Sequence, residues 1–172
     1  MAWRFYNSSG VAKTGDQAIT GRLSVTQVLH VRDEKAQNTT GGTFTSGAWR
    51  TRVLNTSKTN TITGASLASN QITLPAGTYW VDATAPAYTV GRHRVKLYNT
   101  TGAADVLLGT SSFSGGLYDY TLSVLSGQFT LTATSVLELQ HRCETTLATH
   151  GFGVESNFAT EVYSDVVIWK TA

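Results

Sequence analysis

NQITLPAGTYWVDATAPAYTVGRHRVKLYN, residues 70–99, is the stretch that decides the fold. Its first run, residues 71–74, is rich in β-formers and leads into Pro75-Ala76-Gly77, which is typical of a tight turn. The next runs, 78–88 and 93–98, alternate in side-chain character, which predicts half-buried strands. One face would carry Tyr79, Val81, Ala83, Val95 and Leu97, and the other Trp80, Asp82, Arg94, Lys96 and Tyr98. The stretch therefore predicts a meander with one face in the core.

Short runs of the same kind continue along the chain, separated by turns rich in Gly, Asn and Ser. The expected strands are residues 19–32, 49–54, 71–74, 78–88, 93–98, 106–112, 117–125, 129–132, 136–143 and 161–170. Residues 33–46 and 55–70 read as surface connections, the second with short extended pieces. Many short strands, no helical window and no fixed repeat are typical of an antiparallel β-sandwich or jelly roll.

The length and composition fit one domain with a neutral, hydroxyl-rich surface. A chain of 172 residues buries roughly 70% of its extended surface in a single core. Charged residues make up only 14% of the chain, against a typical value of about 25%. The formal net charge of +2 is too small to indicate a nucleic-acid partner. Cys143 is the single cysteine, so no intrachain disulfide is possible.

The N-terminal segment, residues 1–18, reads as an anchor ahead of a domain at 19–172. Trp3, Phe5 and Tyr6 form an aromatic head on a polar tether, and exposed aromatic clusters mark interaction sites. In the alternative interpretation these rings fold back onto their own domain. No stretch pairs a basic flank with an apolar run, and none approaches the ~20 apolar residues that span a bilayer. We therefore expect synthesis in a cytoplasm, without a secretion signal or membrane insertion.

Several segments resemble a known family. LPAGTYWVDATAPAY (74–88) followed by RHRVKLYN (92–99) is similar to the C-terminal jelly-roll modules of bacteriophage fibre and virion-surface proteins, which share the C1q/TNF-like trimeric fold. Its later landmarks are SGQFTLTATSVLELQHRC (126–143) and TEVYSDVVIWK (160–170), so the resemblance runs from about Val25 to the C-terminus. It implies a homotrimeric, non-enzymatic virion protein, assembled in the host cytoplasm and joined to other virion proteins by its N-terminal segment.

Two sets of residues could bind a host-surface glycan. The basic run Arg92, Arg94 and Lys96 lies between Tyr88 and Tyr98 and could meet phosphate or carboxylate groups. The alternative is an ordinary solvated strand face. Tyr118 and Tyr120 lie beside Gly115-Gly116, and aromatic rings on such a loop suit the apolar faces of sugars. Their alternative role is packing at a subunit contact.

The last strand is apolar on both faces, so something must cover the second face. Val162, Val166 and Ile168 would point one way, and Tyr163, Val167 and Trp169 the other. By resemblance to C1q/TNF-like proteins, whose inner sheet lines the three-fold axis, Tyr163, Val167 and Trp169 belong to the trimer interface. In the alternative, the N-terminal strand or a long loop of the same chain covers this face.

Catalytic and metal chemistry receive little support. His141, Cys143 and His150 could supply three zinc ligands, but His141 and Cys143 share a strand face with Leu137 and Leu139. That pattern favours a buried thiol and a hydrogen-bonded core histidine. The carboxylates are scattered, with no paired-acid spacing. We expect no catalytic residue, cofactor or metal, and the alternatives to a virion protein are a stand-alone carbohydrate-binding or adhesin module and a polysaccharide hydrolase.

Overall fold

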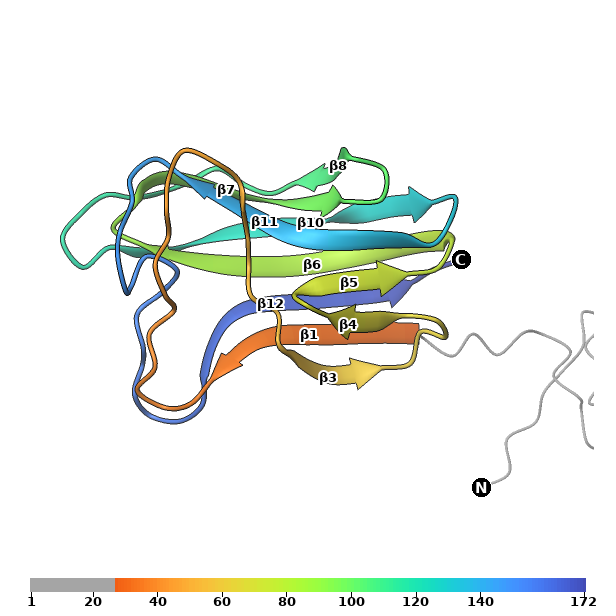
Figure 1. The fold of residues 1–172 in the computed structure, drawn as a ribbon, viewed down its shortest axis with the longest axis horizontal. Coiled ribbons are helices and arrows are strands. Elements are labelled where there is room, and N and C mark those ends of the chain that lie inside the picture. The colour runs from red at the N-terminus through yellow and green to blue at the C-terminus, as the bar shows by residue number, and fades with distance from the viewer. Residues whose placement is uncertain (1–26) are drawn as a thin grey trace, which may run out of the picture.

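The computed structural model describes residues 27–172, which form a sandwich of two antiparallel sheets (Figure 1). One sheet is five-stranded, in the order β10 (Tyr120–Leu131), β6 (Gly77–Tyr88), β12 (Glu161–Lys170), β1 (Gln27–Lys35) and β3 (Thr56–Asn60). The other has β4 (Ser66–Ala68), β5 (Gln71–Leu74), β11 (Ser135–Cys143), β7 (Gly91–Asn99) and β8 (Ala104–Leu108), with β2 (Arg50–Thr51) on β11 and β9 (Ser112–Ser114) on β7. The predicted all-β sandwich is confirmed. None of the described residues forms a helix that could cross a membrane.

The strands β5, β6 and β7 have the predicted side-chain faces but not the predicted neighbours. All five side chains predicted to face the core are buried, and Trp80 and Asp82 are exposed. The predicted meander is wrong, because β6 pairs with β10 and β12 while β5 and β7 pair with β11. Alternation reports which face of a strand is buried, and leaves the choice of neighbouring strand open.

Two connections differ from the sequence-based expectations. The segment 55–70, expected to be a surface connection with short extended pieces, contributes β3 and β4, which pair into the two sheets. The strand expected at 49–54 is regular over only two residues, and Arg52 in it is fully buried. β1 begins at the first described residue, so the anchor residues and residues 19–26 of the expected first strand lie outside the described residues.

A bulge in β12 changes the face on which its side chains lie. Arg32 of β1 is opposite Asp165, and Glu34 is opposite Val162, so Tyr163 and Ser164 together face one residue of β1. Both side chains are buried as a result. The predicted grouping of Tyr163 with Val167 and Trp169 is therefore wrong, since the alternation is interrupted between Tyr163 and that pair.

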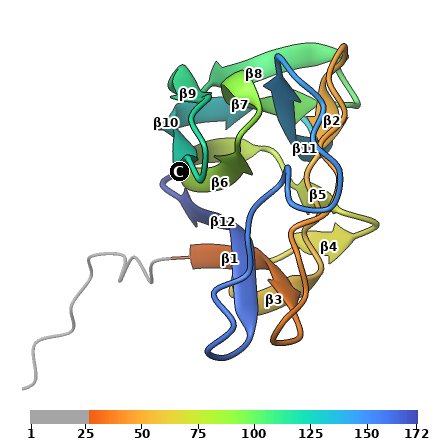
Figure 2. The ribbon, with the colours of Figure 1, turned by 90° about the vertical axis from the view of Figure 1, so that its left-hand side faces the viewer.

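The sandwich has two distinct ends (Figures 1 and 2). Gln27 pairs with Lys170, so β1 begins and β12 ends at one end, which we call the near end. β6 finishes and β10 starts at the opposite end, where Tyr88 pairs with Tyr120; we call this the far end. The loops 115–119 and 144–160 project there, at the left of Figure 1 and toward the viewer in Figure 2.

Candidate functional site

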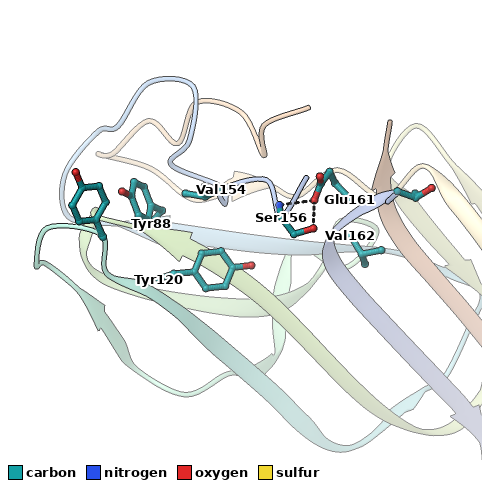
Figure 3. A pocket seen from close by; sticks show the side chains of 8 residues that line it. Tyr88, Tyr120, Val154, Ser156, Glu161 and Val162 are labelled. Atoms are coloured by element: carbon teal, nitrogen blue, oxygen red, sulfur yellow. Dashed lines mark hydrogen bonds between the residues drawn. The ribbon is translucent and has the colours of Figure 1, made fainter. Parts of the chain in front are cut away.

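Three tyrosines line a hollow of about 680 Å³ at the far end (Figure 3). We call it the tyrosine pocket; it is lined by Tyr88, Tyr118, Tyr120, Val154, Ser156, Thr160, Glu161 and Val162. The tyrosines come from the end of β6, the 115–119 loop and the start of β10. The structure thus brings together the three tyrosines predicted from the sequence as glycan-binding candidates.

Hydrogen bonds hold the loop that carries Tyr118. The Ser114 hydroxyl donates to the Asp119 carbonyl over 2.6 Å, and the Gly115 N–H donates to the Asp119 carboxylate over 3.0 Å. Tyr118 adopts the left-handed conformation with φ of 66° and is 78% exposed. A bulky residue in this conformation costs energy, and such strain clusters at functional sites. The loop therefore fixes the backbone at Tyr118 and leaves its ring exposed to solvent.

Glu161 gives the tyrosine pocket one fixed negative charge. Its carboxylate accepts hydrogen bonds from the Ser156 N–H at 2.8 Å, the Ser156 hydroxyl at 2.9 Å and the Asn157 N–H at 2.7 Å. These bonds, led by the one from the Ser156 backbone, hold the pKa of Glu161 below its ordinary value. The carboxylate is ionised at neutral pH and organises the chain just before β12 (Figure 3).

A second hollow of about 550 Å³ collects arginines. We call it the arginine pocket; it is lined by Ser46, Gly47, Trp49, Arg92, His93, Arg94, Ser111, Ser112, Arg142, Cys143 and Glu144. Arg92 pairs with Glu144 at 2.6 Å, and Arg94 Nε donates to the Gly109 carbonyl at 2.6 Å. Arg142, which the sequence reasoning missed, lies opposite Arg94 in the register of β11 and β7. Three arginines and one glutamate thus line the pocket, and Arg92 is the one that pairs with Glu144.

Lys96, the third basic residue of the predicted run, lines neither pocket. Its side chain is buried and its ammonium pairs with Asp105. The same ammonium lies 4.5 Å from the centre of the Trp49 ring and 4.7 Å from that of Tyr98. Lys96 is therefore enclosed by partners within its own chain, and its predicted role in glycan binding stays a prediction.

A buried arginine lies beneath the far-end loops. Arg52 Nε donates to the Ser164 hydroxyl at 2.8 Å, and its terminal nitrogens donate to the carbonyls of Pro86 at 3.3 Å and Phe152 at 3.1 Å. Its guanidinium lies 4.2 Å from the centre of the Phe152 ring. Burial lowers the pKa of Arg52 to about 10, so it remains charged at neutral pH. One side chain thus joins β6, β12 and the 144–160 loop.

Two histidines form a buried pair next to this region. His93 Nδ1 lies 3.0 Å from His141 Nε2, and His93 Nε2 lies 2.7 Å from the Thr121 hydroxyl. His141 Nδ1 is buried without a partner, which suits an unprotonated nitrogen. His141 Nε2–H then donates to His93, and His93 Nε2–H donates to Thr121. Burial lowers the pKa of His93 to about 4 and that of His141 well below its ordinary value, so both are neutral at pH 7.

The buried thiol predicted for Cys143 is confirmed. Cys143 is enclosed at the far end, and burial raises the pKa of its thiol to about 11. A thiol in this state is a poor nucleophile and a poor metal ligand. Among residues 27–172, no three His, Cys, Asp or Glu side chains are placed to hold a metal ion. The zinc alternative therefore finds no support in the described part of the chain.

Comparison with known proteins finds similarity in structure alone. No family model matches the chain, and no curated protein matches its sequence. A crystal structure of murine APRIL at pH 5.0 covers 85% of this chain and 99% of its own, with a TM-score of 0.52 and 11% identity. The globular domain of zebrafish complement 1qA covers 86% and 98%, with a TM-score of 0.52 and 12% identity. These matches confirm that the chain has the C1q/TNF-like jelly-roll fold.

Proposed function

We propose that this protein is a non-enzymatic homotrimeric module whose subunits pack through the outer face of the five-stranded sheet. The observation that carries this proposal is a set of exposed apolar side chains on that face, which lie beside the charged residues Asp82, Arg32 and Asp165. Its exposed large apolar side chains include Trp80 of β6 and Leu122 and Val124 of the adjacent β10. Tyr120 and Val162 are exposed at the far-end edge of this face, where they line the tyrosine pocket, and lie outside the proposed contact. Exposed apolar patches mark protein contact sites, and aromatic residues are enriched in their centres.

The opposite outer face supports the choice of this sheet. On the central strands β7 and β11 the outward side chains are mostly polar or charged: Arg94, Lys96, Tyr98, Glu138, Gln140 and Arg142. Val136 is the outward apolar residue there. An antiparallel sheet with one polar outer face needs no cover on that side. The central strands of the seven-stranded sheet therefore need no cover, and its exposed large apolar residues, Leu108 and Phe113, lie in the outer strands β8 and β9.

The interface we propose is centred near the two predicted residues that do point outward. Trp169 of β12 pairs in register with Trp80 of β6, and Val167 lies two residues away on the same side. Val167 and Trp169 are both half-buried in the single chain. Tyr163 is excluded from this interface, because the β12 bulge turns its ring into the interior.

Sedimentation of matched valine variants tests the trimer. Val167→Asp should convert trimers to monomers, because it buries a charge in the proposed contact. Val136→Asp makes the same change on the outer face of the other sheet and should leave the trimer intact. A wild-type chain that is monomeric at micromolar concentration, with Trp169 still shielded from a soluble quencher, would show that the chain covers this face itself and that the trimer is wrong.

The place of this module on a virus particle rests on the sequence resemblance to phage fibre and virion-surface proteins. The described chain enters the sandwich at the near end, while both pockets lie toward the far end. This polarity supports a particle-bound N-terminal segment, anchored by Trp3, Phe5 and Tyr6, with the far-end loops displayed outward. Deleting residues 1–15 should leave a folded domain that no longer joins its assembly. Loss of folding on this deletion would contradict the anchor.

A second candidate function is attachment to an acidic cell-surface glycan through the arginine pocket. Arg92, Arg94 and Arg142 outnumber Glu144 there, which favours an anionic ligand. The double variant Arg92→Ala/Arg94→Ala should weaken binding to heparin, used as the probe, most clearly at low salt. Lys58→Ala removes a positive charge that pairs with Glu34 on the other sheet, and should have little effect. Equal heparin binding by both variants would remove the arginine pocket from consideration.

A further inference from the structure

We propose that the tyrosine pocket binds the ring of a neutral sugar. This inference goes beyond the proposed trimer, because all eight lining residues come from one chain. The tyrosine pocket is also separate from the arginine pocket, which is lined by other residues and suits an anionic ligand.

The pocket is shaped before any ligand arrives. A Cβ on Gly115 would meet the Phe113 ring at 2.2 Å, so the backbone of the loop lies directly against that ring. The Thr89 N–H donates to the Asp119 carbonyl at 3.0 Å and ties the loop to the end of β6. The backbone that carries Tyr118 is therefore tied to the end of β6, next to Tyr88. A site fixed in this way spends little conformational entropy on binding.

The lining chemistry selects the class of ligand. Tyr118 is 78% exposed and Tyr120 is 45% exposed. Aromatic faces of this kind accept the C–H groups of a sugar ring. Hydroxyl groups of the tyrosines and Thr160 line the pocket and can hydrogen-bond the rim of the ring, while the Ser156 hydroxyl, which donates to Glu161, can still accept. Apolar walls with a few polar groups are the usual composition of a small-molecule site.

The negative charge of the tyrosine pocket favours neutral sugars over acidic ones. Glu161 is the charged residue of the pocket, and no lysine or arginine is among the described residues that line it. The Glu161 carboxylate already accepts its hydrogen bonds from Ser156 and Asn157, so its negative charge is a fixed part of the wall. A carboxylate on the ligand would be repelled. The pocket therefore favours a neutral pyranoside over a uronic or sialic acid.

Saturation-transfer NMR on the full chain tests this inference. The probes are methyl β-D-glucopyranoside, methyl β-D-galactopyranoside and methyl α-D-mannopyranoside, with methyl β-D-glucuronide as the charged comparison. We expect transfer to at least one neutral glycoside and weaker binding of the glucuronide. Tyr118→Ala should weaken binding roughly two- to tenfold through the loss of one stacking ring. Tyr118→Phe should restore most of it, because the ring face is kept.

Leu117→Ala is the matched control. Leu117 is the neighbouring residue on the same loop and is 84% exposed, but it lies outside the pocket lining. Its variant should bind like the wild type. Absence of transfer to all three neutral glycosides, or equal binding by Tyr118→Ala, overturns the inference. Sedimentation of the same samples tests whether a second copy of the chain fills the pocket instead. That occupant is indicated if the wild type binds no sugar and the Tyr118→Ala chain no longer forms trimers.

Discussion

The interior of the sandwich changes character from its apolar body to the far end. The larger core cluster contains aliphatic and aromatic side chains from both sheets, among them Leu29, Val81 and Leu97. The smaller far-end cluster around Phe44 and Cys143 is apolar as well, but Arg52, His93 and His141 are buried beside it. Apolar burial stabilises without direction, whereas hydrogen bonds from a buried guanidinium fix particular atoms. The far end is therefore built to hold loops in place.

The two regions also differ in what they support. Side chains of the larger cluster pack β-strands against β-strands. Arg52 instead contacts Pro86 near the end of β6 and Phe152 in the 144–160 loop, both close to the residues that line the tyrosine pocket. The comparison predicts that damage to the apolar body lowers global stability, while damage to the far-end polar groups also disturbs the pockets.

The largest expected effect follows from Arg52→Met. This change keeps an apolar stem but leaves the Ser164 hydroxyl and the Pro86 and Phe152 carbonyls without their donors. It also leaves Lys35 as the remaining positive charge that acts on Asp33. We expect the free energy of unfolding in urea to fall by about 3–5 kcal/mol. Adding Asp33→Leu should recover part of the loss, because it removes a buried carboxylate that has lost one of its two positive neighbours. A neutral Arg52→Met variant would mean that the far end is held by apolar packing, like the rest of the core.

Acidification should have a somewhat smaller effect. The pKa of His93 is lowered from 6.5 to about 4, mainly by burial and secondly by the positive charge of Arg52. The Asp119 carboxylate partly opposes this shift. Between these values the unfolded chain binds more protons than the folded one, so stability is lost as pH falls through this window. The His93 contribution is about 3 kcal/mol. Burial acts on His141 in the same direction.

Urea unfolding of wild type and His93→Gln at pH 7, 6, 5 and 4 measures this contribution. The variant cannot titrate at this position, so its stability should fall less steeply with acidification. Asp33, whose pKa is raised mainly by burial, acts in the opposite direction toward the acid end and is present in both chains. Parallel pH profiles for the two chains would show that His93 is not the group responsible.

The smallest effect distinguishes two tyrosine hydroxyls. Tyr163 donates to the Thr39 carbonyl at 2.7 Å toward the far end, and Tyr79 donates to the Pro75 carbonyl at 2.7 Å in the larger cluster. Replacement of either by Phe should cost roughly 1 kcal/mol. Tyr163→Phe should also speed amide hydrogen exchange around residues 39–43, whereas Tyr79→Phe should leave exchange there unchanged. Similar exchange in both variants would remove the distinction between the two regions.

The sequence predicted the fold because its main signal is local. Alternation along β6, β7 and β11 placed their buried faces correctly, and turn residues separated the strands. Strand neighbours were not predictable in the same way, because pairing joins distant segments. The change of face at Tyr163 was missed for a related reason, because a bulge depends on the partner strand. The run from Val162 to Trp169 also carries no glycine or proline that would mark a bulge.

The candidate sites were predictable in part. Gly115-Gly116 beside two tyrosines pointed to the loop of the tyrosine pocket, but Val162 and Glu161 arrive there from the last strand. Arg142 joins Arg94 only through the register of β11 and β7. Arg52 gave no signal, since it alternates in step with Arg50 and so reads as a solvated residue, and charged side chains are rarely fully buried. Its burial depends on acceptors from three separate segments.

The pairing of Gln27 with Lys170 at the near end has a mechanical consequence. If the two ends of the chain were pulled apart, β1 and β12 would separate like a zipper, one hydrogen bond at a time. A force applied between residue 27 and a partner bound at the far end has a different direction, because it acts along the strands. The hydrogen bonds that join β1 to both β12 and β3 would then bear the force together, in shear. The same sandwich would be weak toward force between its own termini and strong toward force along its length.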